Sequence, residues 1–296
     1  MSNGLSIVVA AYDRPGQLRD TLNSLFQLRV PAGTAVEILV VLSTRMKDTL
    51  AVVLEAQKRA PIPLRLISEL QPGLSRARNQ GMEEASYDWV AYFDDDVRVA
   101  PDWIDGFFEA VSKSSPDCIV GPVSPLYCDE IPDYISEEVL DSILSSYSRK
   151  GNERLVLDAK VGHEIPGCNF GVRRQAARDI GGFSPEFGRA GPVIIGGDDF
   201  EFGQRLVAAG KRVVYQPRCS IEHAITAEKF SKSWLRRRWY GDGIFKRRAY
   251  PDPAFMKSAR GSVRSAVSIA RGFLWAFLLG LAGRKAGREQ EGGARQ

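Results

Sequence analysis

Three consecutive carboxylates, Asp94, Asp95 and Asp96, directly follow the apolar run 87–93. This run is rich in aromatic and β-branched residues and predicts a buried strand with the acids at its carboxyl end. Side chains alternate along an extended chain, which places Asp94 and Asp96 on one side and Asp95 on the other. Two carboxylates presented together suit Mg²⁺ or Mn²⁺, which take further oxygens from phosphates. Taken alone, the triplet is as compatible with a solvated strand end as with a metal site.

A second acidic group lies in the Gly-Gly-Asp-Asp-Phe-Glu segment at 196–201. Asp198 and Asp199 fall in the first turn of a predicted helix, where free backbone amides and the helix dipole favour anions. A purely structural role explains this placement. The alternative is that one of the two is a general base, held at a helix start behind glycines that let a substrate approach.

Two isolated side chains extend the list of candidates. His223 follows a predicted strand at 212–215, and its imidazole nitrogen can complete a metal site, although a lone histidine is more often structural. Arg78 lies near the start of a predicted helix at 73–85. Arginines there are usually solvated, but beside strand ends Arg78 can contact a phosphate or a base edge.

The elements that must position these residues alternate along the first half of the chain. Apolar runs predict strands and amphipathic stretches predict helices. The strands are predicted at 5–12, 36–43, 64–69 and 87–93, and the helices at 14–28, 44–59 and 73–85. Strands spaced by helices imply βαβ crossovers and a parallel sheet with helices on both faces. Ligands bind such α/β sheets at the carboxyl ends of the strands, where the triplet lies.

The second half is less regular. We expect a helix at 101–113, a strand at 118–123, an irregular segment to about 162, a strand or turn and a helix within 166–183, and a helix from 198 before the strand at 212–215.

Charge divides the chain into two parts. Residues 1–225 hold 24 Lys and Arg against 31 Asp and Glu, whereas residues 226–296 hold 16 against 5. We therefore predict one domain over 1–225, which carries the candidate residues above, and a basic, amphipathic, helical C-terminal extension over 226–296. The four cysteines lack the spacing of a zinc site or a disulfide framework, which suits a reducing cytosol.

The extension contains the apolar run 272–283. As a helix this run reaches ~18 Å, short of the ~30 Å hydrocarbon core. Flanking cations instead favour a helix that lies on an anionic membrane surface. We expect a cytoplasmic protein, peripheral on the inner face of the cell membrane. We expect no nucleic-acid partner, because the acidic body repels phosphate backbones.

Taken in order, the motifs resemble glycosyltransferase family 2, whose members are inverting enzymes with the GT-A fold. The similarity covers about 5–223 and includes the segments SIVVAAYDRP, GLSRARNQG, YFDDDV, GCNFGVRR and GGDDFEFGQRL, and the final histidine. The resemblance implies an α/β fold of GT-A type, a Rossmann-like mixed sheet flanked by helices. It also implies transfer of a sugar from a nucleoside-diphosphate sugar to a hydroxyl of a glycan or lipid-linked acceptor, as in polysaccharide synthesis.

The resemblance assigns roles to single residues. Asp199 matches the catalytic base, and Asp96 and His223 match ligands of the divalent metal, Mn²⁺ or Mg²⁺. The expected nucleotide-sugar-binding residues are Ala10, Tyr12, Arg14, Arg78, Asp94, Asp95, Gly167, Asn169, Asp198 and Arg238. Within this set Asp95 has no role of its own, and its replacement should be the mildest in the triplet.

Two positions depart from the family pattern. Leu42 stands where an aspartate that reads uracil is common, and Leu235 stands where processive members have glutamine, so we expect a non-processive enzyme. Two alternative functions leave features of the sequence unexplained. A nucleotidyltransferase of related fold usually has a glycine-rich basic loop after the first strand, where this chain has only one arginine and one glycine. A non-catalytic membrane-binding module leaves the acids and His223 without a use.

Overall fold

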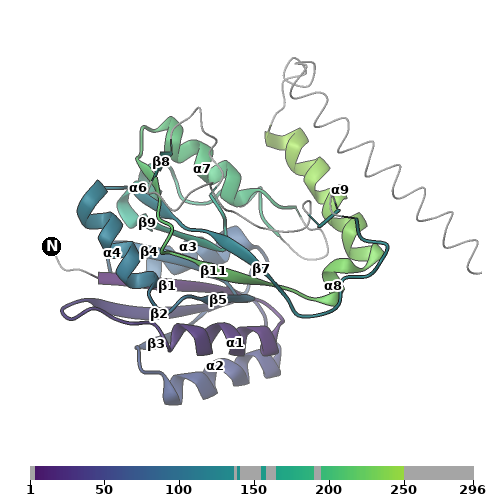
Figure 1. The fold of residues 1–296 in the computed structure, drawn as a ribbon, viewed down its shortest axis with the longest axis horizontal. Helices are drawn as coiled ribbons and strands as arrows, with labels where there is room; N and C mark the ends of the chain where they lie inside the picture. Colours follow the sequence, from purple (N-terminus) through teal and green to yellow (C-terminus); the bar gives the residue numbers. More distant parts are fainter. Residues whose placement is uncertain (1–3, 137–138, 141–154, 158–164, 190–194, 250–296) are drawn as a thin grey trace, which may run out of the picture.

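The structure, a computed structural model, describes residues 4–136, 139–140, 155–157, 165–189 and 195–249. Its centre is an eight-stranded sheet in the order β3-β2-β1-β4-β9-β6-β10-β8 (Figure 1). Four strands from the first half of the chain run parallel: β1 (Gly4–Ala11), β2 (Ala35–Leu42), β3 (Leu64–Ser68) and β4 (Trp89–Asp94). All four match predicted strands. β1, β2 and β4 are mostly apolar and buried, as a sheet covered on both faces requires, and β3 at the edge of the sheet is only partly buried.

The other half of the sheet is mixed. It contains β9 (Asn169–Arg173), β6 (Cys118–Val120), β10 (Val213–Tyr215) and β8 (Leu155–Leu157). Strand β9 runs antiparallel to both β4 and β6, which joins the two halves of the chain at the centre of the sheet. The parallel pattern predicted from the first half therefore ends at β4.

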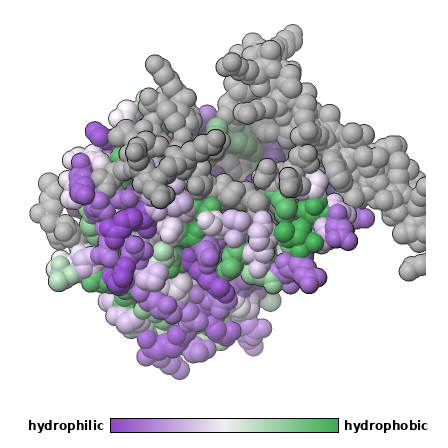
Figure 2. All heavy atoms as spheres, viewed as in Figure 1, coloured by the Kyte–Doolittle hydropathy of each residue, from purple (hydrophilic) through white to green (hydrophobic). Residues whose placement is uncertain are grey.

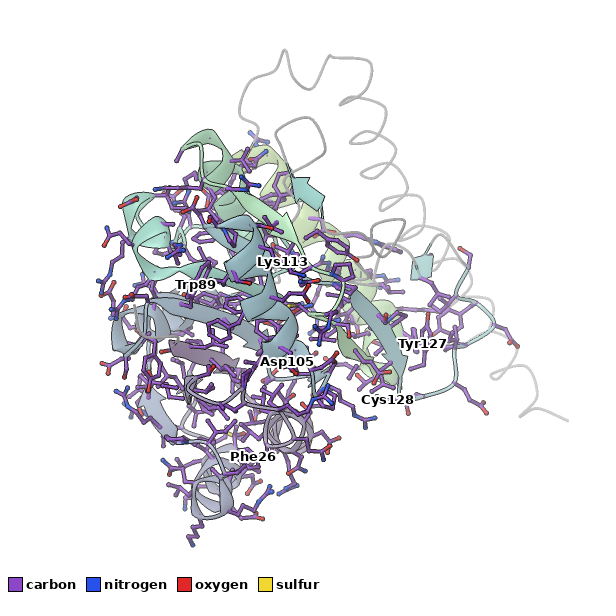
Figure 3. All side chains as sticks on the ribbon, turned by 60° about the vertical axis from the view of Figure 1, so that its left-hand side comes forward. Phe26, Trp89, Asp105, Lys113, Tyr127 and Cys128 are labelled. Carbon is purple, nitrogen blue, oxygen red and sulfur yellow. The ribbon has the colours of Figure 1, made fainter. Side chains whose placement is uncertain are left out.

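A separate three-stranded sheet lies beside the main one and has the order β5 (Val97–Val99), β11 (Ile221–Ile225), β7 (Val123–Tyr127). The single strand predicted at 118–123 divides here, since β6 ends at Val120 and β7 begins at Val123 in the other sheet. Between them the backbone of Gly121 approaches Cys219 so closely that a Cβ would meet the Cys219 carbonyl at 1.8 Å. Figure 3 shows Tyr127 and Cys128 at the far end of β7, away from the main sheet.

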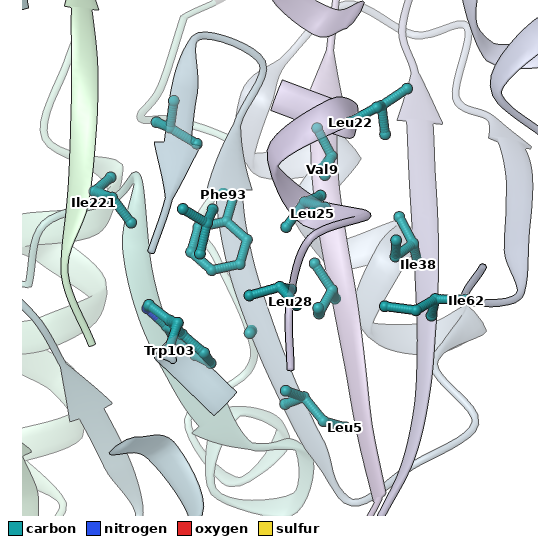
Figure 4. Packing of buried hydrophobic residues seen from close by; sticks show 14 of the residues in the cluster. Leu5, Val9, Leu22, Leu25, Leu28, Ile38, Ile62, Phe93, Trp103 and Ile221 are labelled. Carbon is teal, nitrogen blue, oxygen red and sulfur yellow. The ribbon is translucent and has the colours of Figure 1, made fainter. Parts of the chain in front are cut away.

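Helices cover both faces of the main sheet. One layer is α1 (Pro15–Leu25), α2 (Lys47–Arg59) and α4 (Trp103–Ser114); the other is α3 (Leu74–Glu84), α6 (Arg174–Asp179) and α7 (Asp198–Ala208). Alternation along β1 supplies both cores, because Leu5, Ile7 and Val9 pack in the first and Val8 and Ala10 in the second. Figure 4 shows the first core, with Leu22 and Leu25 of α1 over the sheet.

The outer faces of these helices are polar, and Figure 2 shows hydrophilic residues predominating on the side where α1 and α2 lie. Two more helices, α8 (Ala227–Phe230) and α9 (Lys232–Ala249), follow β11. They join the body through a third apolar cluster that includes Ile225, Phe230, Trp234 and Leu235. The start of the basic segment is thus anchored against the body of the protein.

Candidate active site

The acidic triplet lies at the carboxyl end of β4, whose last residue is Asp94. The chain then enters β5, which pairs with β11 in an antiparallel register that sets Val97 opposite His223. The amide of Ala224 also donates to the carbonyl of Asp96 at 2.8 Å. This pairing of two short strands brings His223 beside the triplet, although the two are far apart in the sequence.

Asp94, Asp96 and His223 each offer one ligand atom, and these atoms lie within 4.8 Å of one another. Asp96 Oδ1 lies 3.1 Å from His223 Nε2, close to the ~3 Å between neighbouring ligands of an octahedral ion with bonds of ~2.1 Å. The same Oδ1 is buried and accepts no hydrogen bond from any group in the described ranges. Carboxylates suit Mg²⁺ and Mn²⁺, and the imidazole favours a transition ion such as Mn²⁺. These residues therefore fit a divalent cation.

Two side-chain cations contact the other oxygen of Asp96. Arg14 Nη1 lies 2.8 Å and Lys229 Nζ lies 3.1 Å from Asp96 Oδ2. Burial alone would raise the pKa of the Asp96 carboxyl, but the imidazole of His223 and the ammonium of Lys229 hold this pKa well below its usual range. Asp96 is therefore an anion at neutral pH.

Asp95 is more deeply involved than strand alternation predicts. It is only 6% exposed, and its carboxylate accepts hydrogen bonds from the amide of Tyr12 at 3.2 Å and from Arg14 at 3.3 Å. Burial raises the pKa of Asp95 to about 6 against the opposing effect of Arg14. Asp95 thus ties the end of β4 to the loop after β1.

Arg78 connects the two acidic motifs. The side chain is buried, and its Nη1 donates to Asp198 at 2.6 Å while Nη2 donates to Asp94 at 3.0 Å and to the carbonyl of Gly167 at 2.6 Å. Burial alone would lower the pKa of the guanidinium, but Asp198 and Asp94 raise it above its usual value. Arg78 is therefore a charged internal cross-link, and its donors are directed at protein groups.

The neighbours Asp198 and Asp199 differ sharply in environment. Asp198 is buried in its pair with Arg78. Asp199 is half-buried, and each of its oxygens accepts one backbone amide at 2.9 Å, Oδ2 from Gly167 and Oδ1 from Phe200. These bonds fix the orientation of the carboxylate and leave each oxygen a further lone pair for a substrate proton.

Glycines allow this close packing. Gly197 precedes α7 in the left-handed region, with φ of +89°, which favours glycine. A Cβ on Gly167 would lie 2.6 Å from Asp199 Oδ2 and 2.9 Å from Arg78 Nη2. A side chain at position 167 would therefore displace the carboxylate or the guanidinium.

Two cavities meet at this place, and both are lined by Asp94, Leu74 and Arg189. The smaller, of about 210 Å³, also has Arg78, Gly167, Asp198, Asp199, His223 and Arg238 in its wall. The larger, of about 380 Å³, extends past the end of β1 and has Ala10, Tyr12, Arg14, Ser43, Asp95, Trp234 and Arg237 in its wall. Helix α9 contributes to both.

Comparison with known proteins identifies the family. Residues 6–181, more than half of the chain, match the sequence profile described as "Glycosyl transferase family 2". The chain belongs to this family. It is a glycosyltransferase, and the family 2 members use a nucleotide sugar as donor.

Curated relatives agree with this assignment. The glycosyltransferase is 25% identical over 240 residues to "Succinoglycan biosynthesis protein ExoM" of Rhizobium meliloti, covering 81% of this chain and 72% of the relative. It is 25% identical over 178 residues to "Glucosyl-dolichyl phosphate glucuronosyltransferase" of Haloferax volcanii, covering 59% of this chain and 55% of that protein.

Solved structures confirm the predicted GT-A fold. The "Mannosyltransferase PcManGT from Pyrobaculum calidifontis in complex with GDP-Man and Mn2+" has a TM-score of 0.61 at 17% identity. The match covers 95% of this chain and 79% of the mannosyltransferase chain. The structure of "GalNAc-T7 with UDP, GalNAc and Mn2+" has a TM-score of 0.60 at 18% identity. The match covers 84% of this chain and 51% of the GalNAc-T7 chain. At these identities the likeness concerns the fold.

The predicted site residues come together in this glycosyltransferase with one exception. Asn169 is fully buried, and its side chain is used by protein groups on both sides. Its amide nitrogen donates to the carbonyls of Pro122 and Cys219, and its oxygen accepts from the indole of Trp103. Asn169 is absent from the wall of both cavities, and its hydrogen bonds hold β9 against neighbouring segments; its contact with a sugar stays a prediction.

Several residues in the site are not among those predicted from the sequence, and three of them have polar or aromatic side chains close to the predicted ones. Lys229 contacts Asp96, Arg189 lines both cavities, and Trp234 lines the larger one. Lys229 and Trp234 lie in the segment that charge counting assigned to the C-terminal extension. The only sequence signal was their nearness to His223, which does not reveal that β11 leads straight into the site.

The apolar run 272–283, which is predicted to lie on a membrane surface, is outside the described residues. No helix within the described ranges is long and apolar enough to cross a membrane.

Proposed function

We propose that the protein is a metal-dependent, inverting glycosyltransferase that moves a sugar from a nucleoside-diphosphate sugar to an acceptor hydroxyl. One observation carries the proposal. Asp199, with its carboxylate held by two backbone amides, shares the wall of a cavity of about 210 Å³ with the metal-ligand candidates Asp94 and His223. A candidate general base and candidate ligands of the metal that would bind the diphosphate thus line the same cavity, which is large enough for a sugar.

The larger cavity suits the nucleoside part of the donor. Tyr12 is 59% exposed there and offers an aromatic face for a base, while Trp234 lies in the same wall. Leu42 is buried in β2, and the adjacent Ser43, whose hydroxyl has no hydrogen-bond partner in the described part of the chain, is the polar group at that strand end. The site therefore lacks the aspartate that commonly reads uracil in the family.

The diphosphate belongs where the two cavities meet. Arg189 reaches both cavities, and Arg237 and Arg238 each line one of them, so positive charge surrounds this place. Asp96 and His223, with Asp94 beside them, would hold Mn²⁺ or Mg²⁺. The bound cation would neutralise charge that develops on the departing nucleoside diphosphate.

Asp199 is the base in this proposal because Asp198 is used otherwise. The acceptor hydroxyl gives its proton to Asp199, and its oxygen attacks the anomeric carbon as the bond to the diphosphate breaks. This single displacement inverts the configuration at that carbon. The fixed orientation of the carboxylate supplies the alignment that such an in-line attack needs.

The acceptor in our proposal is a glycan or a lipid-linked saccharide. The names of the relatives support this class, since one belongs to succinoglycan biosynthesis and one acts on a dolichyl phosphate sugar. We also propose that the basic C-terminal segment brings the enzyme to an anionic membrane surface on the cytoplasmic side, where such acceptors are found. Transfer to an acceptor in vesicles, with and without anionic lipid, measures this contribution.

The decisive test replaces Asp199 by asparagine. This variant should lose transfer by at least about 10³-fold, in the upper part of the range for a general base, because the amide cannot take the proton. Binding of nucleoside diphosphates, followed by thermal shift, should persist. Unchanged turnover would refute the base assignment, and retention of configuration in the product would refute single displacement. Release of pyrophosphate in place of a nucleoside diphosphate would point to a nucleotidyltransferase.

A further inference from the structure

Lys229 has no role in the function proposed above, yet it is among the most buried cations of the described chain, at 5% exposure. It lies on α8, one turn after β11 delivers His223 to the site. Its ammonium group contacts the carbonyl of Ala224 at 2.7 Å, Asp96 Oδ2 at 3.1 Å and His223 Nε2 at 3.3 Å. Two of its three neighbours are therefore candidate ligands of the divalent cation.

The contact with His223 conflicts with metal binding. An ammonium group is a donor only, so in the tautomer of His223 with an unprotonated Nε2, Lys229 Nζ at 3.3 Å donates to the lone pair of that nitrogen. A metal ion would need the same lone pair. Neither group can hold Nε2 while the other does.

Charge adds to this conflict. An ion bound to His223 Nε2 and Asp96 Oδ1 would lie within a few ångströms of the Lys229 ammonium in a buried site, where repulsion between cations is weakly screened. Arg14 already pairs with Asp96 Oδ2, so Asp96 keeps a partner when Lys229 moves away. The site can therefore exchange one cation for another without leaving a bare buried carboxylate.

We propose that Lys229 is an internal cation that occupies the metal centre of the metal-free protein and is displaced when the divalent cation binds. The inference rests on the proposed metal dependence and deepens it. Because α8 leads into α9, which lines both cavities, this exchange links occupancy of the metal centre to the helix that borders the donor site. The opposing possibility is a positioning residue, in which Lys229 holds Asp96 ready for the ion.

The two roles predict opposite changes in metal affinity. Full-length wild type, Lys229→Gln and the control Lys113→Gln, whose lysine is exposed on α4, are freed of metal and titrated with Mn²⁺ alone, with free Mn²⁺ followed by electron paramagnetic resonance. Displacement predicts that the Kd of Lys229→Gln falls at least tenfold, whereas Lys113→Gln matches wild type. An equal or higher Kd in Lys229→Gln overturns the inference and leaves the proposed function standing. Absence of saturable binding in all three proteins overturns both.

A second measurement uses wild type only, in case Lys229→Gln does not fold. Acetylation of lysines by a water-soluble ester is timed by mass spectrometry with and without Mn²⁺. Displacement predicts that modification of Lys229 accelerates severalfold when Mn²⁺ binds, while Lys113 in the same digest keeps its rate. An unchanged rate at Lys229 under saturating Mn²⁺ overturns the inference.

Discussion

Replacing Arg78 by methionine tests whether the two acidic motifs are held together by a buried cation. Methionine keeps much of the apolar stem and removes the guanidinium, which leaves Asp198 buried without its partner at 2.6 Å and takes a donor from Asp94. Removing one partner of a buried ion pair costs about 3–5 kcal/mol. For a protein of this size each kcal/mol lowers the melting temperature by about 2–4 °C, so we expect a decrease of about 6–20 °C.

The assays are thermal unfolding for the melting temperature and urea unfolding for the free energy, both followed by fluorescence, with a double-mutant cycle that includes Asp198→Asn. If the loss comes from an uncompensated charge, Arg78→Met combined with Asp198→Asn should recover about 1–3 kcal/mol relative to the sum of the single changes. Arg178→Met is the matched control, because its pair with Glu83 is exposed and its loss should leave the midpoint unchanged. A cost below about 1 kcal/mol for Arg78→Met would refute the role of Arg78 as an internal cross-link.

Two further changes test the packing around the site and the sheet. Gly167→Ala should lower turnover at least tenfold with little loss of fold, because its Cβ would meet Asp199 Oδ2 at 2.6 Å; activity equal to wild type, checked beside circular dichroism, would contradict this. For Glu37, burial alone would raise the pKa of the carboxyl, but hydrogen bonds from Ser6 and Ser86 lower it below its ordinary value of about 4.3. The ionised Glu37 carboxylate therefore contributes fully to the free energy of unfolding above that value. This contribution is lost as pH falls through the lower pKa that Glu37 has in the folded protein. Urea midpoints of wild type and Glu37→Gln should differ at pH 7 and converge in acid, and a constant difference would exclude this linkage.

Local pattern was enough for the first half of the fold. The strands β1, β2 and β4 are mostly apolar runs of six to eight residues, and this character depends only on neighbouring residues. These strands and the shorter β3 were predicted within one or two residues of their observed ends. The second half was less predictable because its strands are three to five residues long. Such short runs carry little periodicity, and β6 and β7 were merged into one predicted strand.

Predictions for single residues succeeded where the surroundings of the side chain are set by residues close in the sequence. Asp94 and Asp96 were placed correctly beside His223, because their own strand end and the family pattern both indicated it. Asp95 was expected to point away, and it is instead buried against the loop after β1. Alternation describes a straight strand, and the chain turns between β4 and β5 at this position.

The sequence by itself determined the family, the GT-A class of fold and the acidic motifs at the strand ends, because apolar periodicity and motif spacing are properties of contiguous residues. Only the tertiary structure decided which groups Arg78, Asn169 and Lys229 contact. Each has the chemistry of a ligand-binding residue, and each has its donors directed at protein groups from distant segments: Asp198 for Arg78, Cys219 for Asn169 and Asp96 for Lys229. The partner of a buried polar group is set by which strands and helices pack side by side, and that information is spread over the whole chain.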